Sequence, residues 1–194
     1  MTDAGDARRR RLEEAALGVF LRYGFRKASM DEVAQAAGVS RQALYLHFAT
    51  KEELFRAAVG RFFDDGQVAV DAALGDEARP LEARLLGAFD AWVGRYVGAH
   101  GDGADDLAAA AAEHAGALVT SREEAFVASV AQAMRRGGLA AAYRGARLSA
   151  RQLAETLYAT ARGLKHGSTR DAFTRSMTVA VRAMCAPLRQ GSEG

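Results

Sequence analysis

Residues 30–48, MDEVAQAAGVSRQALYLHF, hold two short helical patterns on either side of Gly38. Each has apolar residues at helical spacing on one face, but neither is long enough to be stable as an isolated helix. A glycine with a small residue four positions earlier, Ala34, permits a sharp turn and a steep crossing of two helices. The stretch therefore predicts a helix-turn-helix unit that other helices hold in place. The residues expected to face inward are Met30, Val33, Ala34, Ala37, Leu44 and Phe48.

Helix start and stop signals divide the first third of the chain into four predicted helices. Residues 29–32 (SMDE) and 50–53 (TKEE) are capping boxes, in which a hydroxyl accepts a hydrogen bond from the first turn and a glutamate reaches back. Ser40 is a further N-cap, and Gly24 and Gly38 are residues typical of helix ends. The predicted helices cover approximately residues 6–23, 30–38, 41–48 and 51–73.

Further helical patterns follow, and the composition favours an all-α fold. Alanine, leucine and arginine recur throughout, valine-rich alternating runs are absent, and the chain contains only two prolines. Glycine-containing breaks at residues 101–103, 137–138 and 167–168 separate the later patterns. We therefore predict an all-α chain of about nine helices, the later ones at residues 81–99, 104–119, 121–136, 150–165 and 169–186.

Cysteine usage and hydropathy indicate a reducing, aqueous compartment. The single cysteine, Cys185, cannot form an internal disulfide and lies in an apolar stretch. No apolar run approaches the ~20 residues needed to cross a bilayer. The basic residues 8–11 lead into an amphipathic helix rather than a signal peptide. We expect a soluble, cytoplasmic protein with no membrane partner.

The helix that follows Gly38 has an outward face of hydrogen-bonding side chains. Arginine and glutamine pair bidentately with guanine and adenine edges in the major groove, whose width of ~12 Å admits a helix of two turns. Residues 1–63 contain 11 Lys or Arg against 8 Asp or Glu, so the basic excess lies in this part of the chain. The alternative is an ordinary helical hairpin with a solvated polar face. The outward residues are Arg41, Gln42, Tyr45 and His47.

Residues 24–59, GFRKASMDEVAQAAGVSRQALYLHFATKEELFRAAV, resemble the DNA-binding domain of the tetracycline-repressor-like (TetR/AcrR) family of transcriptional regulators. The resemblance implies a helix-turn-helix DNA-binding domain at residues 1–50. It also implies a larger helical effector-binding and dimerisation domain at residues 51–194, linked through the helix that starts at Lys51. The matching positions are Gly24-Phe25, Ser29, Val33-Ala34, Ala37-Gly38-Val39-Ser40, Leu44-Tyr45, His47-Phe48, Lys51-Glu52 and Leu54.

The resemblance also implies which positions contact DNA. The helix after Ser40 would be the recognition helix, with Tyr45 and Lys51 on phosphates. Ala43 departs from the glycine that many members carry, and either contacts a thymine methyl group or permits a close approach. His47 is open between reading bases and positioning the helix. The expected DNA-binding residues are Ser29, Ser40, Arg41, Gln42, Ala43, Tyr45, His47 and Lys51, with base reading assigned to Arg41 and Gln42.

Two apolar stripes near the end of the chain predict a dimer interface. A palindromic operator requires two recognition helices held about one DNA turn apart, which a two-fold dimer provides. A four-helix bundle across a two-fold axis would bring the stripes of two copies together. The alternative is that both stripes are intramolecular core. The expected interface residues are Leu153, Leu157, Ala161, Leu164, Met177, Val181, Met184 and Leu188.

The resemblance also implies an effector pocket, for which large apolar and amphipathic side chains on the helices that would enclose it are candidates. Few charges lie among them, so an apolar or aromatic small molecule is the expected ligand. Each side chain is alternatively part of the core. The candidates are Phe62, Phe63, Phe89, Trp92, Tyr96, Phe126, Met134 and Tyr158, with His114 as either a polar anchor or a structural histidine.

The resulting expectation is a homodimeric repressor that a small effector releases from double-stranded operator DNA. The acidic and histidine residues at 100–114 match no metal-ligand spacing, and nucleophile-elbow and phosphate-loop motifs are absent. We therefore expect no catalytic activity, no metal and no cofactor. One rival is a helix-turn-helix protein that binds DNA without an effector. Another is an enzyme built on the later helices.

Overall fold

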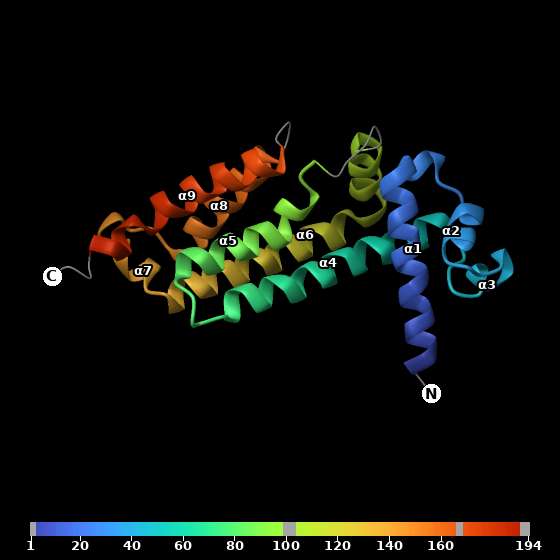
Figure 1. The fold of residues 1–194 in the computed structure, drawn as a ribbon, viewed down its shortest axis with the longest axis horizontal. Helices are drawn as coiled ribbons and strands as arrows, with labels where there is room; N and C mark the ends of the chain where they lie inside the picture. Colours follow the sequence, from blue (N-terminus) through green and yellow to red (C-terminus); the bar gives the residue numbers. More distant parts are fainter. Residues whose placement is uncertain (1–2, 99–103, 166–168, 191–194) are drawn as a thin grey trace. The chain divides into compact units, whose positions relative to one another are not determined.

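The computed structural model describes residues 3–98, 104–165 and 169–190, and these contain helices joined by turns (Figure 1). Within these ranges there are nine α-helices, two short 3₁₀ segments and no strand, which confirms the all-α prediction. None of the described helices is both long enough and apolar enough to span a bilayer. The elements are α1 (Asp3–Lys27), α2 (Met30–Ala36), α3 (Arg41–Tyr45), α4 (Lys51–Gly75), α5 (Leu81–Trp92), η1 (Gly94–Tyr96), α6 (Ala104–Arg136), α7 (Leu139–Ala142), η2 (Arg144–Ala146), α8 (Ala150–Leu164) and α9 (Arg170–Gln190).

Contacts divide the chain into two compact units. Unit 1 comprises residues 1–65 and 100–122, and unit 2 comprises residues 66–99 and 123–194. Two helices, α4 and α6, therefore contribute residues to both units. The expected boundary between a DNA-binding domain at residues 1–50 and an effector-binding domain at residues 51–194 stays a prediction.

Unit 1 is built around a core that α1, α2, α3 and the start of α4 share. The helical spacing of Leu12, Ala16 and Phe20 places them on one buried stripe of α1. The Phe20 ring meets the Phe55 ring of α4 edge to face, with centroids 5.0 Å apart. This packing stabilises helices that are individually too short to persist.

The predicted helix starts in unit 1 are confirmed by their hydrogen bonds. Ser29 Oγ accepts from Glu32 N at 3.2 Å, and Glu32 accepts from Ser29 N at 2.8 Å. Ser40 Oγ accepts from Ala43 N at 3.1 Å. The third start differs in one detail, because the Glu53 carboxylate accepts from Ala49 N rather than from the capping residue itself. Both short helices thus have satisfied first turns.

The predicted stop at Gly24 marks a break inside α1. Gly24 has φ 79° and ψ 170°, a conformation that side-chain-bearing residues avoid. The Asp106 carboxylate of α6 packs there and accepts a hydrogen bond from Arg26 N at 2.9 Å. It also pairs with Arg26 Nε at 3.1 Å. The first turn of α6 is therefore bonded to the last turn of α1, beyond the break at Gly24.

Three later boundaries differ from the sequence-based prediction. The helices expected at 104–119 and 121–136 are one continuous helix, α6, because no glycine or proline interrupts the chain between them. The helix expected at 81–99 ends at Trp92. A four-residue helix, α7, was not predicted. The total remains nine α-helices in the described ranges because one merger and one addition offset each other.

Unit 2 contains α5, α7, α8 and α9 with parts of α4 and α6. Both α5 and α8 pack on α9, and α8 and α9 lie side by side in Figure 1. The nearly buried Arg84 of α5 donates from Nε to Leu74 O at 2.9 Å, which satisfies a carbonyl at the C-terminal end of α4. Cys185 is buried, as its apolar surroundings predict, and burial raises the pKa of its thiol to about 11.

Candidate nucleic-acid interface

The turn between α2 and α3 presents one face of α3 to solvent. Gly38 adopts φ 66°, and Val39 N donates to Ala34 O at 3.0 Å across the turn. The side chains of Leu44 and Phe48 are completely buried, which orients the opposite face outward. Helical hydrogen bonding continues beyond the last residue of α3, since Phe48 N donates to Leu44 O at 3.1 Å. A short, fixed helix with an exposed face has the form needed to enter the major groove.

The outward face consists of Arg41, Gln42 and Tyr45, all exposed, with Ala43 and His47 partly buried. Arg41 Nη1 donates to Asp31 Oδ2 of α2 at 2.9 Å, and both side chains are about 60% exposed (62% and 61%). The Arg41 guanidinium carbon lies 5.5 Å from the centre of the Tyr45 ring. An ion pair this exposed contributes about 0–1 kcal/mol, so Arg41 can exchange Asp31 for a base edge at little cost.

The two capping serines differ in what they can offer to DNA. The Ser29 hydroxyl donates to Glu32 Oε2 at 2.8 Å, so its hydrogen is used inside the chain. The Ser40 oxygen accepts from Ala43 N, and its hydrogen has no acceptor in the part of the chain that is described. Of the two hydroxyls, Ser40 is therefore the better phosphate donor.

Lys51 occupies a position that the sequence did not reveal. Its Nζ donates to Phe25 O at 3.0 Å and to Ala28 O at 3.2 Å, and lies 4.5 Å from the centre of the Phe25 ring. An ammonium group has three N–H donors, so two are used on carbonyls of the α1–α2 junction. The first turn of α4 is thereby attached to the segment that carries the helix-turn-helix. The contacts of Lys51 thus position the segment from Phe25 to Ala28, and they leave at most one N–H donor for a phosphate.

One exposed residue of this face was missed in the sequence. Leu46 follows Tyr45 and is 82% exposed, the highest value among the large apolar side chains that the structure describes. Its place four residues after Gln42 on the outward side was the available signal. Sequence reasoning passed over it because it selected side chains that form hydrogen bonds.

The expected ligand-binding residues belong to two different units of the chain. Phe63 and His114 belong to unit 1, where the His114 ring lies against the Phe25 ring at 4.8 Å. In unit 2, the Phe126 ring stacks on Trp92 with centroids 4.8 Å apart and meets Phe89 edge to face at 5.2 Å. The Trp92 and Phe89 rings thus both pack on the Phe126 ring. Phe62 also belongs to unit 1, Met134 is buried in unit 2, and the side chain of Tyr96 lies outside the described residues.

Tyr158 extends the aromatic cluster toward two charged residues. Its ring centre is 5.5 Å from that of Phe126, and the Arg162 guanidinium lies 5.9 Å from the centre of the Tyr158 ring. Burial, together with a hydrogen bond to the Glu123 carboxylate, raises the pKa of Tyr158 far above its usual value. The phenol is therefore neutral at physiological pH and serves as a hydrogen-bond donor.

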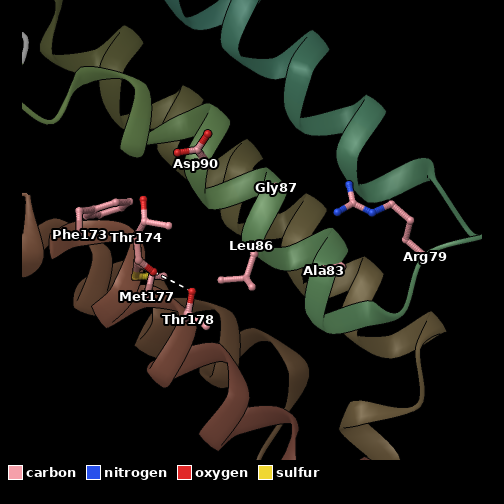
Figure 2. A pocket seen from close by; sticks show the side chains of 9 residues that line it. All are labelled: Arg79, Ala83, Leu86, Gly87, Asp90, Phe173, Thr174, Met177 and Thr178. Atoms are coloured by element: carbon pink, nitrogen blue, oxygen red, sulfur yellow. Dashed lines mark hydrogen bonds between the residues drawn. The ribbon is translucent and has the colours of Figure 1, made fainter. Parts of the chain in front are cut away.

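One groove in unit 2 lies between α5 and α9 (Figure 2). It has a volume of about 270 Å³, and a second hollow of about 140 Å³ lies at the C-terminal ends of α4 and α6. Neither is lined by an expected ligand residue, so the sequence-based pocket stays a prediction. The larger groove is lined by Arg79, Ala83, Leu86, Gly87, Asp90, Phe173, Thr174, Met177 and Thr178.

The apolar stripes of α8 and α9 are mainly core of the single chain. Five of the eight expected interface residues are buried without any partner molecule, because α8 packs directly on α9. These five side chains are thus covered within one chain, and their place in a dimer interface stays a prediction. The buried five are Leu153, Leu157, Ala161, Met177 and Val181, whereas Leu164, Met184 and Leu188 are partly exposed.

Residues 12–58 match the family described as bacterial regulatory proteins, tetR family. Over 88 residues the chain is 41% identical to the HTH-type transcriptional activator FasR of Mycolicibacterium smegmatis, covering 44% of this chain and 40% of FasR. Over 68 residues it is 38% identical to the HTH-type transcriptional repressor BepR of Brucella suis, covering 34% of this chain and 32% of BepR. The chain thus matches less than half the length of each relative.

Solved structures extend the likeness to nearly the whole fold. A transcriptional regulator from Rhodococcus sp. Rha1 superimposes with a TM-score of 0.66 at 22% identity, covering 92% of this chain and 96% of that one. The ketosteroid transcriptional regulator KstR2 of Mycobacterium tuberculosis gives a TM-score of 0.60 at 20% identity, covering 91% and 94%. At these identities the likeness establishes a shared arrangement of helices.

Proposed function

We propose that this chain, which belongs to the TetR/AcrR family of transcriptional regulators, is a homodimeric repressor that a small, mainly apolar effector releases from a palindromic operator. The observation that carries the proposal is the two-sided recognition helix. Leu44 and Phe48 fasten α3 to the core, while Arg41, Gln42 and Tyr45 are exposed. These exposed groups are suited to guanine, adenine and phosphate respectively.

Selection of DNA from a random pool by the purified protein tests this proposal. We expect an enriched palindrome whose half-sites are about one helical turn apart, because two copies of α3 must enter successive major grooves on one side of the duplex. A reporter gene placed behind the selected sequence should be less active when the protein is present. A pool that shows no enrichment would contradict the proposal. A more active reporter would indicate an activator, as FasR is named.

Arg41 is the side chain to which we assign a guanine contact. Replacing Arg41 with alanine is expected to weaken operator binding about tenfold and to relax the preference at one position in each half-site. Titrations of the selected operator and of its single-base variants measure both effects. The control is Arg22→Ala, which removes an exposed arginine of α1 outside the turn and should leave base preference unchanged. Unchanged preference in Arg41→Ala would remove Arg41 from base reading.

Dimerisation is proposed through the outward surfaces of α8 and α9 rather than through their buried stripes. Val179 is 68% exposed on α9, and small residues such as Ala159 and Gly163 are exposed on α8. Small side chains allow two helices to approach closely, and an exposed valine supplies apolar area. Sedimentation equilibrium with and without operator measures the stoichiometry, and two chains per palindrome are expected.

Effector response is proposed to act through both helices that the two units share. A ligand bound in unit 2 would favour one arrangement of α4 and α6, each of which continues into unit 1. In unit 1, Lys51 of α4 donates to Phe25 O and Ala28 O, and Asp106 of α6 accepts from Arg26 N between them. Sequence reasoning expected only the link through α4. Displacement of these two attachments would change the position of α3 and lower operator affinity.

Asp106 offers a direct test of the attachment through α6. Replacing Asp106 with alanine removes one hydrogen bond to Arg26 N and one ion pair, and is expected to lower the free energy of unfolding by about 1–2 kcal/mol. Urea denaturation measures this change. Glu113→Ala, on an exposed face of the same helix, should change the free energy of unfolding by less than about 0.5 kcal/mol. Equal effects of the two variants would show that the attachment contributes nothing.

A DNA-binding protein without an effector is the second candidate, and one observation favours it. Each of the two grooves described above, of about 270 and 140 Å³, is smaller than the ~300–1,000 Å³ typical of ligand pockets. Thermal denaturation with a panel of apolar compounds separates the candidates. An effector should both raise the melting temperature and release operator, whereas the second candidate predicts that no compound does either.

A further inference from the structure

Leu46 is a large apolar residue that is exposed at the end of the recognition helix. Its side chain is 82% exposed, while Leu44 and Phe48, two residues to either side, are completely buried. Single exposed leucines are common on protein surfaces. The position of Leu46 on the outward face of the recognition helix is what distinguishes it.

Backbone geometry places Leu46 beside the expected base-reading side chains. Leu46 has φ −66° and ψ −22°, and its N–H donates to Gln42 O at 3.2 Å, so the helical turn includes it. Residues three and four apart lie on the same side of a helix, which puts Leu46 next to Ala43 and Gln42. Gln42, Ala43 and Leu46 thus form one surface, with the amide of Gln42 at one side and the apolar side chain of Leu46 at the other.

We propose that Leu46 reads a thymine in each half-site by packing against its 5-methyl group. This inference rests on the proposed function and adds a base that the hydrogen-bonding residues do not assign. Leucine cannot bond a phosphate or a polar base edge, and thymine is the base whose major-groove edge carries a methyl group. Contact between the two removes apolar surface from water on both partners. Ala43, one turn earlier, is too short to cover the same area.

Operator DNA with single thymines replaced by deoxyuridine tests the contact, because uracil differs from thymine only by the missing methyl group. For the wild-type protein, one such replacement per half-site is expected to weaken binding about fourfold for each methyl group lost. Leu46→Ala should bind thymine and uracil operators equally at that position. Leu46→Met keeps an apolar side chain of similar volume and should retain the difference.

Val68→Ala is the matched control, since it truncates an exposed apolar side chain on α4 and should leave the thymine–uracil difference as in the wild type. If no thymine replacement weakens the wild-type complex, or if Leu46→Ala shows the same penalty as the wild type, the contact is overturned while operator binding stands. If no operator is enriched from the random pool, the proposed function fails and takes this inference with it. The melting temperatures of the variants are expected to match that of the wild type, which would show that a loss of binding is not caused by unfolding.

Discussion

Replacing Phe48 with alanine is expected to lower the free energy of unfolding by about 3–5 kcal/mol. The ring is completely buried in the core of unit 1, and the Arg9 guanidinium carbon lies 4.5 Å from its centre. Truncation would leave a cavity and remove the anchor that fixes the end of the recognition helix. Operator affinity should fall with stability, because α3 loses one of its two buried attachments, the other being Leu44.

The control for Phe48→Ala lies two residues away. Leu46→Ala removes an apolar side chain from the same turn, but from its exposed side, and should change the free energy of unfolding by less than about 0.5 kcal/mol. Urea denaturation of the two variants gives the comparison directly. Similar losses in both would mean that the division of α3 into a buried and an exposed face is wrong.

Replacing Lys51 with alanine is expected to lower the free energy of unfolding by roughly 2–3 kcal/mol. The variant leaves Phe25 O and Ala28 O without the ammonium donor that now reaches both, and removes the cation above the Phe25 ring. Lys27→Ala, which removes an exposed lysine from the end of α1, is the matched control and should be close to the wild type in stability.

Salt dependence separates positioning from phosphate binding at Lys51. Each phosphate contact contributes about 0.9 to the slope of log affinity against log salt concentration. Since two of its donors are used inside the chain, we expect Lys51→Ala to change the slope by clearly less than that amount while still weakening binding to all sequences. A full change in slope with unchanged stability would return Lys51 to the role of a phosphate ligand.

Local signals predicted unit 1 well. The capping serines, the glycine at the turn and the buried spacing of Leu44 and Phe48 all depend on residues within a few positions of one another. Such interactions are visible in a sequence because helical geometry fixes which neighbours meet. The outward face, and with it most of the candidate DNA contacts, followed from the same geometry.

Long-range contacts could not be predicted in this way. The stripes of α8 and α9 have the same apolar spacing whether they cover each other or a second copy, and the structure shows that they cover each other. The aromatic residues expected to line a pocket have the same composition as a filled core, and Trp92 and Phe126 are stacked. Periodicity indicates which face of a helix is apolar, but not what that face meets.

By itself, the sequence determined the all-α class, the helix-turn-helix and the side of α3 that faces outward, because each follows from hydrogen bonds and side-chain directions within one or two turns. The tertiary structure alone decided that Lys51 is bonded to carbonyls near the end of α1 and that Asp106 of α6 is bonded to the same segment. These outcomes depend on residues 23 to 80 positions apart along the chain. Whether residues this far apart along the chain come into contact is set only by the packing of the whole unit.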